Sequence, residues 1–269
     1  MMDVARNKDL PGNLPASLQA ELRGEVAVLR LSRPQKRNAL DDDTVAGLEV
    51  FFQELPSSVK AVVLHGEGDH FSAGLDLNEL TERDFAEAVD HSRGWHRIFE
   101  QIEFGKVPVV SVLHGAVVGG GLELACATHV RVAEKSAYYG LPEGTRGIFV
   151  GGGGSVRIPR VIGVSRMMEM MLTGRTYGAE EGQALGLSHH LVEPGQGLKK
   201  GLELAAKIAS NTSLTNFAII QALPRIAEQD RASGYLTESL VASLTQSGGE
   251  AKARLKAFLE KRAPKVVRD

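Results

Sequence analysis

The sequence predicts an α/β domain followed by an all-helical C-terminal region, and three observations lead to this fold class. Short apolar runs at Val59–His65, Val107–His114 and His129–Ala133 alternate with helical patterns, which is typical of a largely parallel sheet. From Gly197 onward, helical patterns follow one another without a strand between them. The length of 269 residues suits one large domain with an appended helical subdomain.

The N-terminal part of the chain predicts an arm, a strand and a helix. Residues 1–20 are polar and lack the apolar segment of a signal peptide, so we expect a flexible arm. Leu22–Leu31 is apolar on both faces, as in a buried strand. The acidic run Asp41–Asp43 then favours a helix start, and the apolar positions that follow keep helical spacing up to Pro56.

Longer helices are predicted further along the chain. Thr81–Phe104 carries an apolar stripe that includes Phe85, Val89, Phe99 and Ile102. The C-terminal patterns cover Lys199–Ser210, Ser213–Asp230, Gly234–Gln246 and Glu250–Arg262. We therefore expect an arm at 1–20, a core at 21–196 and a helical region at 197–269. So short a helical region cannot build a large core alone, and should pack on the main domain or another subunit.

Composition excludes several classes of protein. The net charge is −2, which gives no support to a general nucleic-acid or membrane-surface role. Cys126 is the single cysteine, so an intramolecular disulfide is impossible and a reducing compartment fits. The histidines show no metal-ligand spacing. No apolar run is long enough to span a bilayer, and we expect the protein to be located in the cytoplasm.

The first segment with chemical content is Ser72–Leu77 (SAGLDL), which follows a predicted strand. Its small residues and Gly74 let the backbone approach a ligand closely and leave N–H groups unpaired. Taken alone, the segment fits an ordinary strand-to-helix loop better than a binding loop.

The second segment is Gly115–Leu124 (GAVVGGGLEL), in which three glycines run into a helix start. Free backbone N–H groups at a helix start favour binding of an anion. The segment is neither a Walker A loop nor a G-x-G-x-x-G fingerprint. Glu123 in the first turn would repel a phosphate, whereas a carbonyl that gains charge only in the transition state is compatible with it. Glu123 itself suits an acid or base role.

The third segment is Tyr138–Gly144 (YYGLPEG), where a stiff Pro-Glu turn fixes the direction of Glu143. A lone glutamate of this kind is more often a surface acid. The three segments together, in this order and spacing, resemble the enoyl-CoA hydratase/isomerase (crotonase) family. Arg33–Leu40 resembles the early CoA-binding stretch of that family, and Gly174–Ser188 a later segment. The resemblance covers roughly residues 20–262.

The resemblance implies a crotonase-like spiral of β-β-α repeats with a C-terminal helical trimerisation region, in a homotrimer or a dimer of trimers. It also implies an oxyanion hole formed by the N–H groups of Leu75 and Gly120. The glutamate pair Glu123 and Glu143 implies addition of water to a 2-enoyl-CoA, giving a 3-hydroxyacyl-CoA. In this scheme Glu143 exchanges the proton at Cα while both glutamates hold the water.

The same resemblance implies the contacts of an acyl-CoA thioester. Coenzyme A is then part of the substrate, and no metal or other cofactor is expected. The implied CoA-binding residues are Lys36, Arg37, Ala39, Ala73, Asp76, Leu77 and Gly119. For Lys36 and Arg37 the alternative of two solvated loop cations is equally good. The acyl pocket is expected along the Thr81–Phe104 helix, with Trp95 and Phe99 as candidate lining residues.

Three departures from the family pattern leave the substrate open. Arg146 and Phe149 follow Glu143 where hydratases commonly have smaller residues, so each is a candidate to reshape the acyl end or alter the pKa of Glu143. His129 replaces a usual aspartate and is interpreted as structural. Two rivals therefore remain: another crotonase-type reaction (isomerase, C–C hydrolase or lyase) and a non-catalytic acyl-CoA-binding protein.

Overall fold

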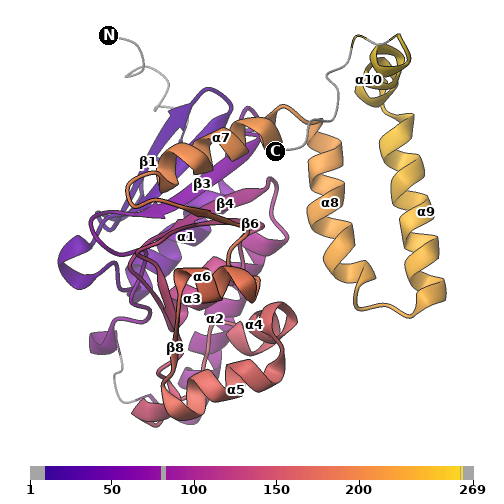
Figure 1. Cartoon of the computed structure of the whole chain (residues 1–269). Coiled ribbons are helices and arrows are strands. Elements are labelled where there is room, and N and C mark those ends of the chain that lie inside the picture. Colours follow the sequence, from indigo (N-terminus) through magenta and orange to yellow (C-terminus); the bar gives the residue numbers. More distant parts are fainter. Residues whose placement is uncertain (1–9, 80–82, 261, 263–269) are drawn as a thin grey trace, which may run out of the picture. The chain divides into compact units, whose positions relative to one another are not determined.

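The computed structural model describes residues 10–79, 83–260 and 262. The chain forms two compact units that divide between Ile208 and Ala209. The first unit contains two sheets and the helices that cover them, and the second contains only helices (Figure 1).

A six-stranded sheet forms the centre of the first unit, with the order β1-β2-β3-β4-β6-β9. The β1 and β2 strands are antiparallel, and every later neighbour pair is parallel. The largely parallel sheet expected from the alternating pattern is thus confirmed. The strands are β1 Leu18–Arg23, β2 Val26–Leu31, β3 Ala61–Gly66, β4 Val109–Leu113, β6 Val130–Glu134 and β9 His190–Val192.

The N-terminal strand differs from the prediction in two ways. Leu22–Leu31 is not one strand, because the chain turns at Gly24, whose φ is +66°, and pairs back on itself as a hairpin. The expected arm is also too long, since Leu18 already begins β1 and Leu10 is buried. Residues 1–9 of the arm lie outside the described residues.

Helices cover both faces of the sheet. Alternate side chains of β3 point to opposite faces, so Val62 joins the core cluster that includes the buried side of α1 (Asp42–Gln53). On the other face, α7 (Gly197–Ala209) approaches so closely that a Cβ at Gly201 would lie 2.6 Å from Val112. This contact explains why α7 belongs to the first unit and the division falls one helix later than the expected boundary at 196/197.

The helix expected at Thr81–Phe104 is α2 (Phe85–Glu103). It begins at Phe85 because Asp84 and Glu87 form a capping box. The predicted apolar stripe is right only in its C-terminal half: Phe99 and Ile102 are buried, whereas Phe85 and Val89 are exposed. Residues 80–82 lie outside the described residues.

A small second sheet positions the candidate site. It consists of β5 (Ala116–Val118), β7 (Tyr138–Gly140) and β8 (Thr176–Gly178), none of which was predicted as a strand. The β5 and β7 strands are parallel, with Val118 opposite Gly140. Their carboxyl ends therefore meet, and the segment after β5 lies beside the segment after β7.

The remaining elements complete the two units. In the first unit they are η2 Pro34–Lys36, η3 Leu77–Glu79, α3 Gly120–Cys126, η4 Gly144–Arg146, α4 Gly154–Ile162, α5 Val164–Thr173 and α6 Ala179–Ala184. The second unit contains α8 Ser213–Ile226, α9 Arg231–Ser247 and α10 Gly249–Leu259, close to the predicted helices. Thr212 and Asp230 cap α8 and α9 with side-chain hydrogen bonds.

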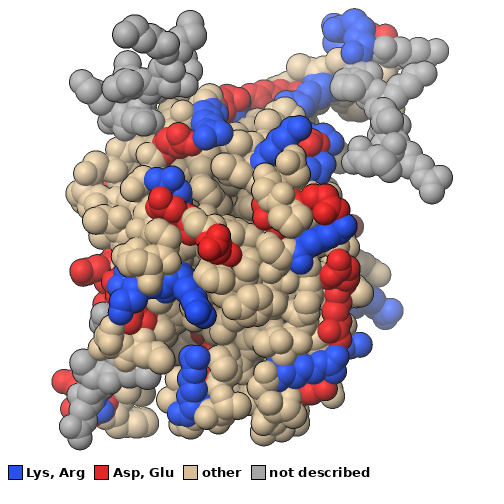
Figure 2. Space-filling view, turned by 60° about the vertical axis from the view of Figure 1, so that its left-hand side comes forward, with Lys and Arg blue, Asp and Glu red and all other residues tan. Residues whose placement is uncertain are grey.

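The surface carries both signs of charge. Figure 2 shows basic and acidic side chains interspersed on the face that it presents, which agrees with a net charge of −2. Among the described helices, none combines the length and the apolar character needed to cross a membrane.

Candidate active site

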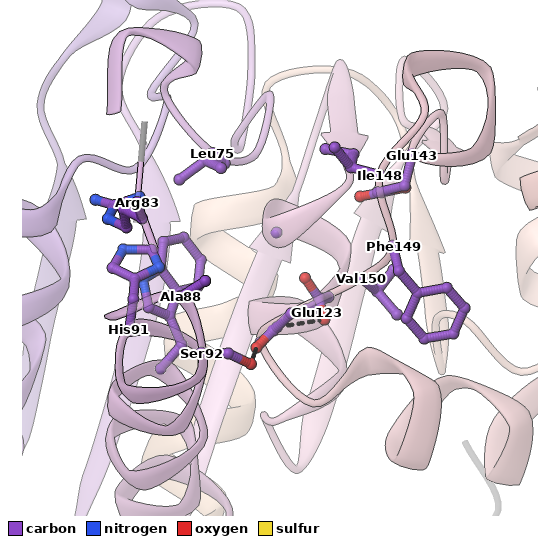
Figure 3. A pocket seen from close by; sticks show the side chains of 14 residues that line it. Leu75, Arg83, Ala88, His91, Ser92, Glu123, Glu143, Ile148, Phe149 and Val150 are labelled. Atoms are coloured by element: carbon purple, nitrogen blue, oxygen red, sulfur yellow. Dashed lines mark hydrogen bonds between the residues drawn. The ribbon is translucent and has the colours of Figure 1, made fainter. Parts of the chain in front are cut away.

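A cavity of about 350 Å³ lies between the N-terminal half of α2 and the Ile148–Gly152 segment (Figure 3). Leu75, Gly120, Glu123 and Glu143 all line it, so the structure brings together the four residues expected to be catalytic. The other lining residues are Arg83, Ala88, His91, Ser92, Trp95, Ile148, Phe149, Val150, Gly151 and Gly152.

Leu75 is held by the backbone on either side of it. Leu40 donates to the Gly74 carbonyl at 2.8 Å and accepts from the Asp76 N–H at 2.8 Å. In such a parallel bridge the N–H of the central residue points away from the partner strand. The Leu75 N–H therefore faces away from Leu40 and has no acceptor among the described residues.

Gly120 supplies a second free N–H beside that of Leu75. It is the first residue of α3, where backbone N–H groups have no intrahelical acceptor. A Cβ on Gly120 would lie 3.4 Å from the Leu75 nitrogen and 3.0 Å from the Trp95 ring, so glycine allows the close approach. Two N–H donors without an acceptor among the described residues thus lie close together, as an oxyanion hole requires.

The Glu123 side chain extends from the first turn of α3 toward the backbone of Gly152 and Gly154. Its Oε1 accepts hydrogen bonds from the Gly152 N–H at 2.9 Å and the Gly154 N–H at 2.7 Å. Burial raises the pKa of Glu123, while these two hydrogen bonds and the nearby Arg157 cation act in the opposite direction. A Cβ on Gly154 would lie 2.6 Å from the Glu123 Cγ, so this position must be glycine.

Arg157 holds the glycine segment whose N–H groups bind Glu123, a role that no sequence motif indicated. Its guanidinium donates to the Gly152 carbonyl at 3.1 Å and pairs with Glu103 at 2.5 Å. The Arg157 side chain is only 7% exposed, so both contacts are well shielded from water. The available signal was the Gly151–Gly154 run directly before a helix.

Glu143 faces the same cavity from the turn after β7. Burial raises its pKa to about 7, the negative charge of Glu123 adds to the effect, and Arg146 opposes it weakly. The Oε2 atom is buried and has no hydrogen-bond partner among the described residues. Glu143 is therefore a carboxyl in the cavity wall whose pKa suits proton exchange near neutral pH.

The three departures from the family pattern have different outcomes. Arg146 is exposed and absent from the cavity lining, and its effect on Glu143 is the smallest of those acting. Phe149 does line the cavity, with 68% of its surface exposed. The structural interpretation of His129 is supported, because its ring accepts from the Val109 N–H and lies 3.0 Å from the Glu103 carbonyl oxygen.

The residues expected to bind CoA cluster around the Leu40–Leu75 bridge. The Ala73 N–H donates to the Arg37 carbonyl at 2.9 Å, which joins the early stretch to the first loop. Lys36, Arg37 and Leu77 are exposed, and Ala39 is buried. Asp76 is already engaged within the protein, since its carboxylate pairs with Arg33 at 2.8 Å.

The expected acyl pocket is lined by one of its two candidate aromatic residues. Trp95 lines the cavity, whereas Phe99 is fully buried behind it at a ring distance of 5.5 Å. Arg83, His91 and Ser92 also line the cavity and were not singled out from the sequence. Among the described residues, no three His, Cys, Asp or Glu side chains gather as a metal site.

Comparisons with known proteins agree with this geometry. The family model for enoyl-CoA hydratase/isomerase matches residues 21–267, so the chain belongs to that family. The order of the elements and the solved relatives confirm the expected crotonase-like fold.

Individual relatives narrow the class to hydratases. The short-chain-enoyl-CoA hydratase of Clostridium acetobutylicum is 32% identical over 90% of this chain and 94% of its own length. The 2,3-dehydroadipyl-CoA hydratase of Escherichia coli is 32% identical, over 89% of this chain and 94% of that protein. A crystal structure from Rhodopseudomonas palustris, of a protein proposed to be an enoyl-CoA hydratase, is 56% identical with a TM-score of 0.90, covering 92% of this chain and 96% of its own.

Proposed function

We propose that this enzyme adds water across the C=C bond of a 2-enoyl-CoA thioester and releases a 3-hydroxyacyl-CoA. The observation that carries the proposal is the meeting of two buried carboxyl groups and two free N–H donors in one cavity. Hydration needs both sets, because one proton leaves the attacking water and another is added to Cα, while negative charge develops on the thioester oxygen. The hydratase relatives support the same reaction.

The N–H groups of Leu75 and Gly120 receive the thioester oxygen. As the water oxygen bonds to Cβ, electron density moves from the C=C bond through Cα to that oxygen, and an enolate forms. Loss of one such donor typically lowers the rate by about 10²–10³-fold. Both donors are backbone groups, so their positions depend on the Leu40–Leu75 bridge and on the start of α3.

The two glutamates divide the proton transfers. Glu123, as the carboxylate, takes a proton from the attacking water, and Glu143, as the acid, gives a proton to Cα. Three contacts favour the negatively charged form of Glu123: the hydrogen bonds from the Gly152 and Gly154 N–H groups and the Arg157 cation. For Glu143, burial and the charge of Glu123 outweigh a backbone hydrogen bond and Arg146, and the resulting pKa of about 7 suits a proton donor at neutral pH.

The CoA part of the substrate lies along the early stretch and the first loop in this proposal. Lys36 and Arg37 flank its nucleotide end, and Ala39, Ala73, Asp76, Leu77 and Gly119 follow its path. The exposure of both cations and the hydrogen bond from the Ala73 N–H to the Arg37 carbonyl support this placement. Asp76 acts through Arg33, which it holds, and no further cofactor takes part in the reaction.

We also propose a homotrimer or a dimer of trimers in the cytoplasm. Large apolar side chains on the helices of the second unit remain exposed, which supports a subunit contact there: Leu223, Tyr235, Leu240, Leu244 and Phe258. Cys126 is buried and free, as suits a reducing compartment. Light scattering on the purified enzyme checks the assembly, and a monomeric mass would contradict it.

Hydration is tested by following the loss of the conjugated thioester absorbance of crotonyl-CoA. We expect Glu123→Gln and Glu143→Gln each to lower kcat by about 10²–10⁴-fold. Glu100→Gln on α2 is the matched control, because Glu100 is exposed and lies outside the cavity. Tight CoA binding with no hydration of short or medium enoyl-CoAs would overturn the proposal, and unchanged activity in both variants would favour a binding protein.

A further inference from the structure

One wall of the cavity carries a cation. Arg83 and His91 lie together on the α2 side of the cavity, opposite Glu143, Ile148 and Phe149 (Figure 3). The Arg83 side chain is 20% exposed and that of His91 25%, so both are largely withdrawn from water. An unsubstituted alkyl chain of a substrate would displace water from this cation without offering it a hydrogen-bond acceptor, which is energetically unfavourable.

Asp42 fixes both side chains from outside the cavity. Its Oδ2 pairs with the Arg83 guanidinium at 3.2 Å, and its Oδ1 with the His91 Nε2 at 2.7 Å. Both carboxylate oxygens are thereby used. Arginine has five N–H donors, and the described contacts of Arg83 engage one of its nitrogens. The wall is therefore pre-oriented and still has donors to offer.

Trp95 closes the same wall. Its side chain lines the cavity next to His91, at a ring distance of 6.1 Å, and it is only 5% exposed. The indole Nε1 is buried and has no hydrogen-bond partner among the described residues. The donors that this wall offers to a ligand are therefore those of Arg83 that Asp42 leaves unused, and an unpaired donor shielded from water costs free energy until a ligand satisfies it.

We infer that the cavity selects 2-enoyl-CoA thioesters whose acyl chain ends in a carboxylate, with Arg83 as the group that receives it. This inference rests on the proposed hydratase function. A carboxylate supplies acceptors for the Arg83 donors that Asp42 leaves unused, and a planar guanidinium matches its geometry. Ile148, Phe149 and Val150 cover the methylene part of the chain on the opposite wall. The negative charge of Glu123 repels the distal carboxylate, which directs it toward Arg83.

Two six-carbon substrates test the inference, since they differ only at the distal end: 2-hexenoyl-CoA and the CoA monothioester of 2-hexenedioic acid. We expect kcat/KM of the wild type to favour the carboxylated chain by about tenfold or more. Arg83→Met and Arg83→Gln should each lower that ratio by roughly 10- to 100-fold, whereas Arg83→Lys retains most of it.

Arg97→Met is the matched control. Arg97 lies on α2, pairs with Glu49 and is outside the cavity, so the ratio should stay at the wild-type value. A wild-type preference for the alkyl chain, or a ratio that changes less than about twofold in both neutral variants, overturns the inference. Crotonyl-CoA separates the two proposals: if it is hydrated without any carboxylate preference, only this inference fails, and if no enoyl-CoA is hydrated, the proposed function fails.

Discussion

Gly119 lies directly against the carboxyl group of Glu143, so that a Cβ at position 119 would be 2.8 Å from the Glu143 Oε1. The two residues come from segments that are far apart in the chain and meet because β5 and β7 are parallel. Gly119 also has a φ of +55°, in a region that disfavours side chains. One residue therefore fixes both the direction of Glu143 and the start of α3.

Gly119→Ala is expected to lower kcat by about 100-fold, because the new methyl group displaces Glu143 and strains the turn that presents the Gly120 N–H. Steady-state hydration of crotonyl-CoA checks this. Gly94→Ala is the control for the same chemical change, since nothing lies within 4 Å of the added Cβ. Near wild-type activity of Gly119→Ala would show that Glu143 does not need its present position.

The pH profile should report the shared proton of the glutamate pair. Because the pKa of Glu143 is about 7, the pair loses its proton as pH rises through that value, and kcat/KM for hydration should fall there. The reverse dehydration should fall over the same range, since the equilibrium of hydration does not involve a net proton. Glu123→Gln removes the neighbouring negative charge and should move the high-pH limb to lower pH. A high-pH limb that does not move in Glu123→Gln would show that the charge of Glu123 does not raise the pKa of Glu143.

Arg157→Met should lower kcat by up to about 100-fold with a small effect on KM, because the glycine segment that orients Glu123 loses its anchor. The pKa of Glu123 should rise as the cation disappears, so the low-pH limb of the profile should move to higher pH. A purely structural role for Arg157 would not move that limb. Arg157→Lys tests the charge alone, and Arg160→Met, an exposed arginine on the same helix, is the control.

Gly94→Ala should raise the free energy of unfolding by about 0.5–1 kcal/mol, because Gly94 lies inside α2 with open space around it. Gly163→Ala is the opposite case: the space is open, but the φ of +83° disfavours alanine, so the variant should be destabilised. Denaturant midpoints at an unchanged slope measure both. Equal effects of the two substitutions would contradict this explanation.

Local patterns were enough to predict most elements of the fold. The α1 helix follows from Asp41, which accepts a hydrogen bond from the Thr44 N–H, and from apolar positions at helical spacing. The helices of the second unit were likewise predicted close to their observed bounds. The short strands β5, β7 and β8 were not predicted, because three residues carry too little periodicity and their pairing is between distant segments.

The chemical groups were readable from the sequence, whereas their environments were not. Leu75, Gly120, Glu123 and Glu143 were named from motif order, and the structure brings them to one cavity. The Arg83 and His91 wall depends on Asp42, a residue of a different helix, so no local spacing indicates it.

The sequence by itself determined the fold class, the family and the identity of the two glutamates, since each depends on residue types at short spacing. Tertiary structure decided which glutamate is solvated by backbone N–H groups and which is left with a pKa of about 7. It also decided that a cation lines the acyl cavity. The physical reason is that pKa and selectivity arise from burial and from charges that the fold brings together across many residues of chain.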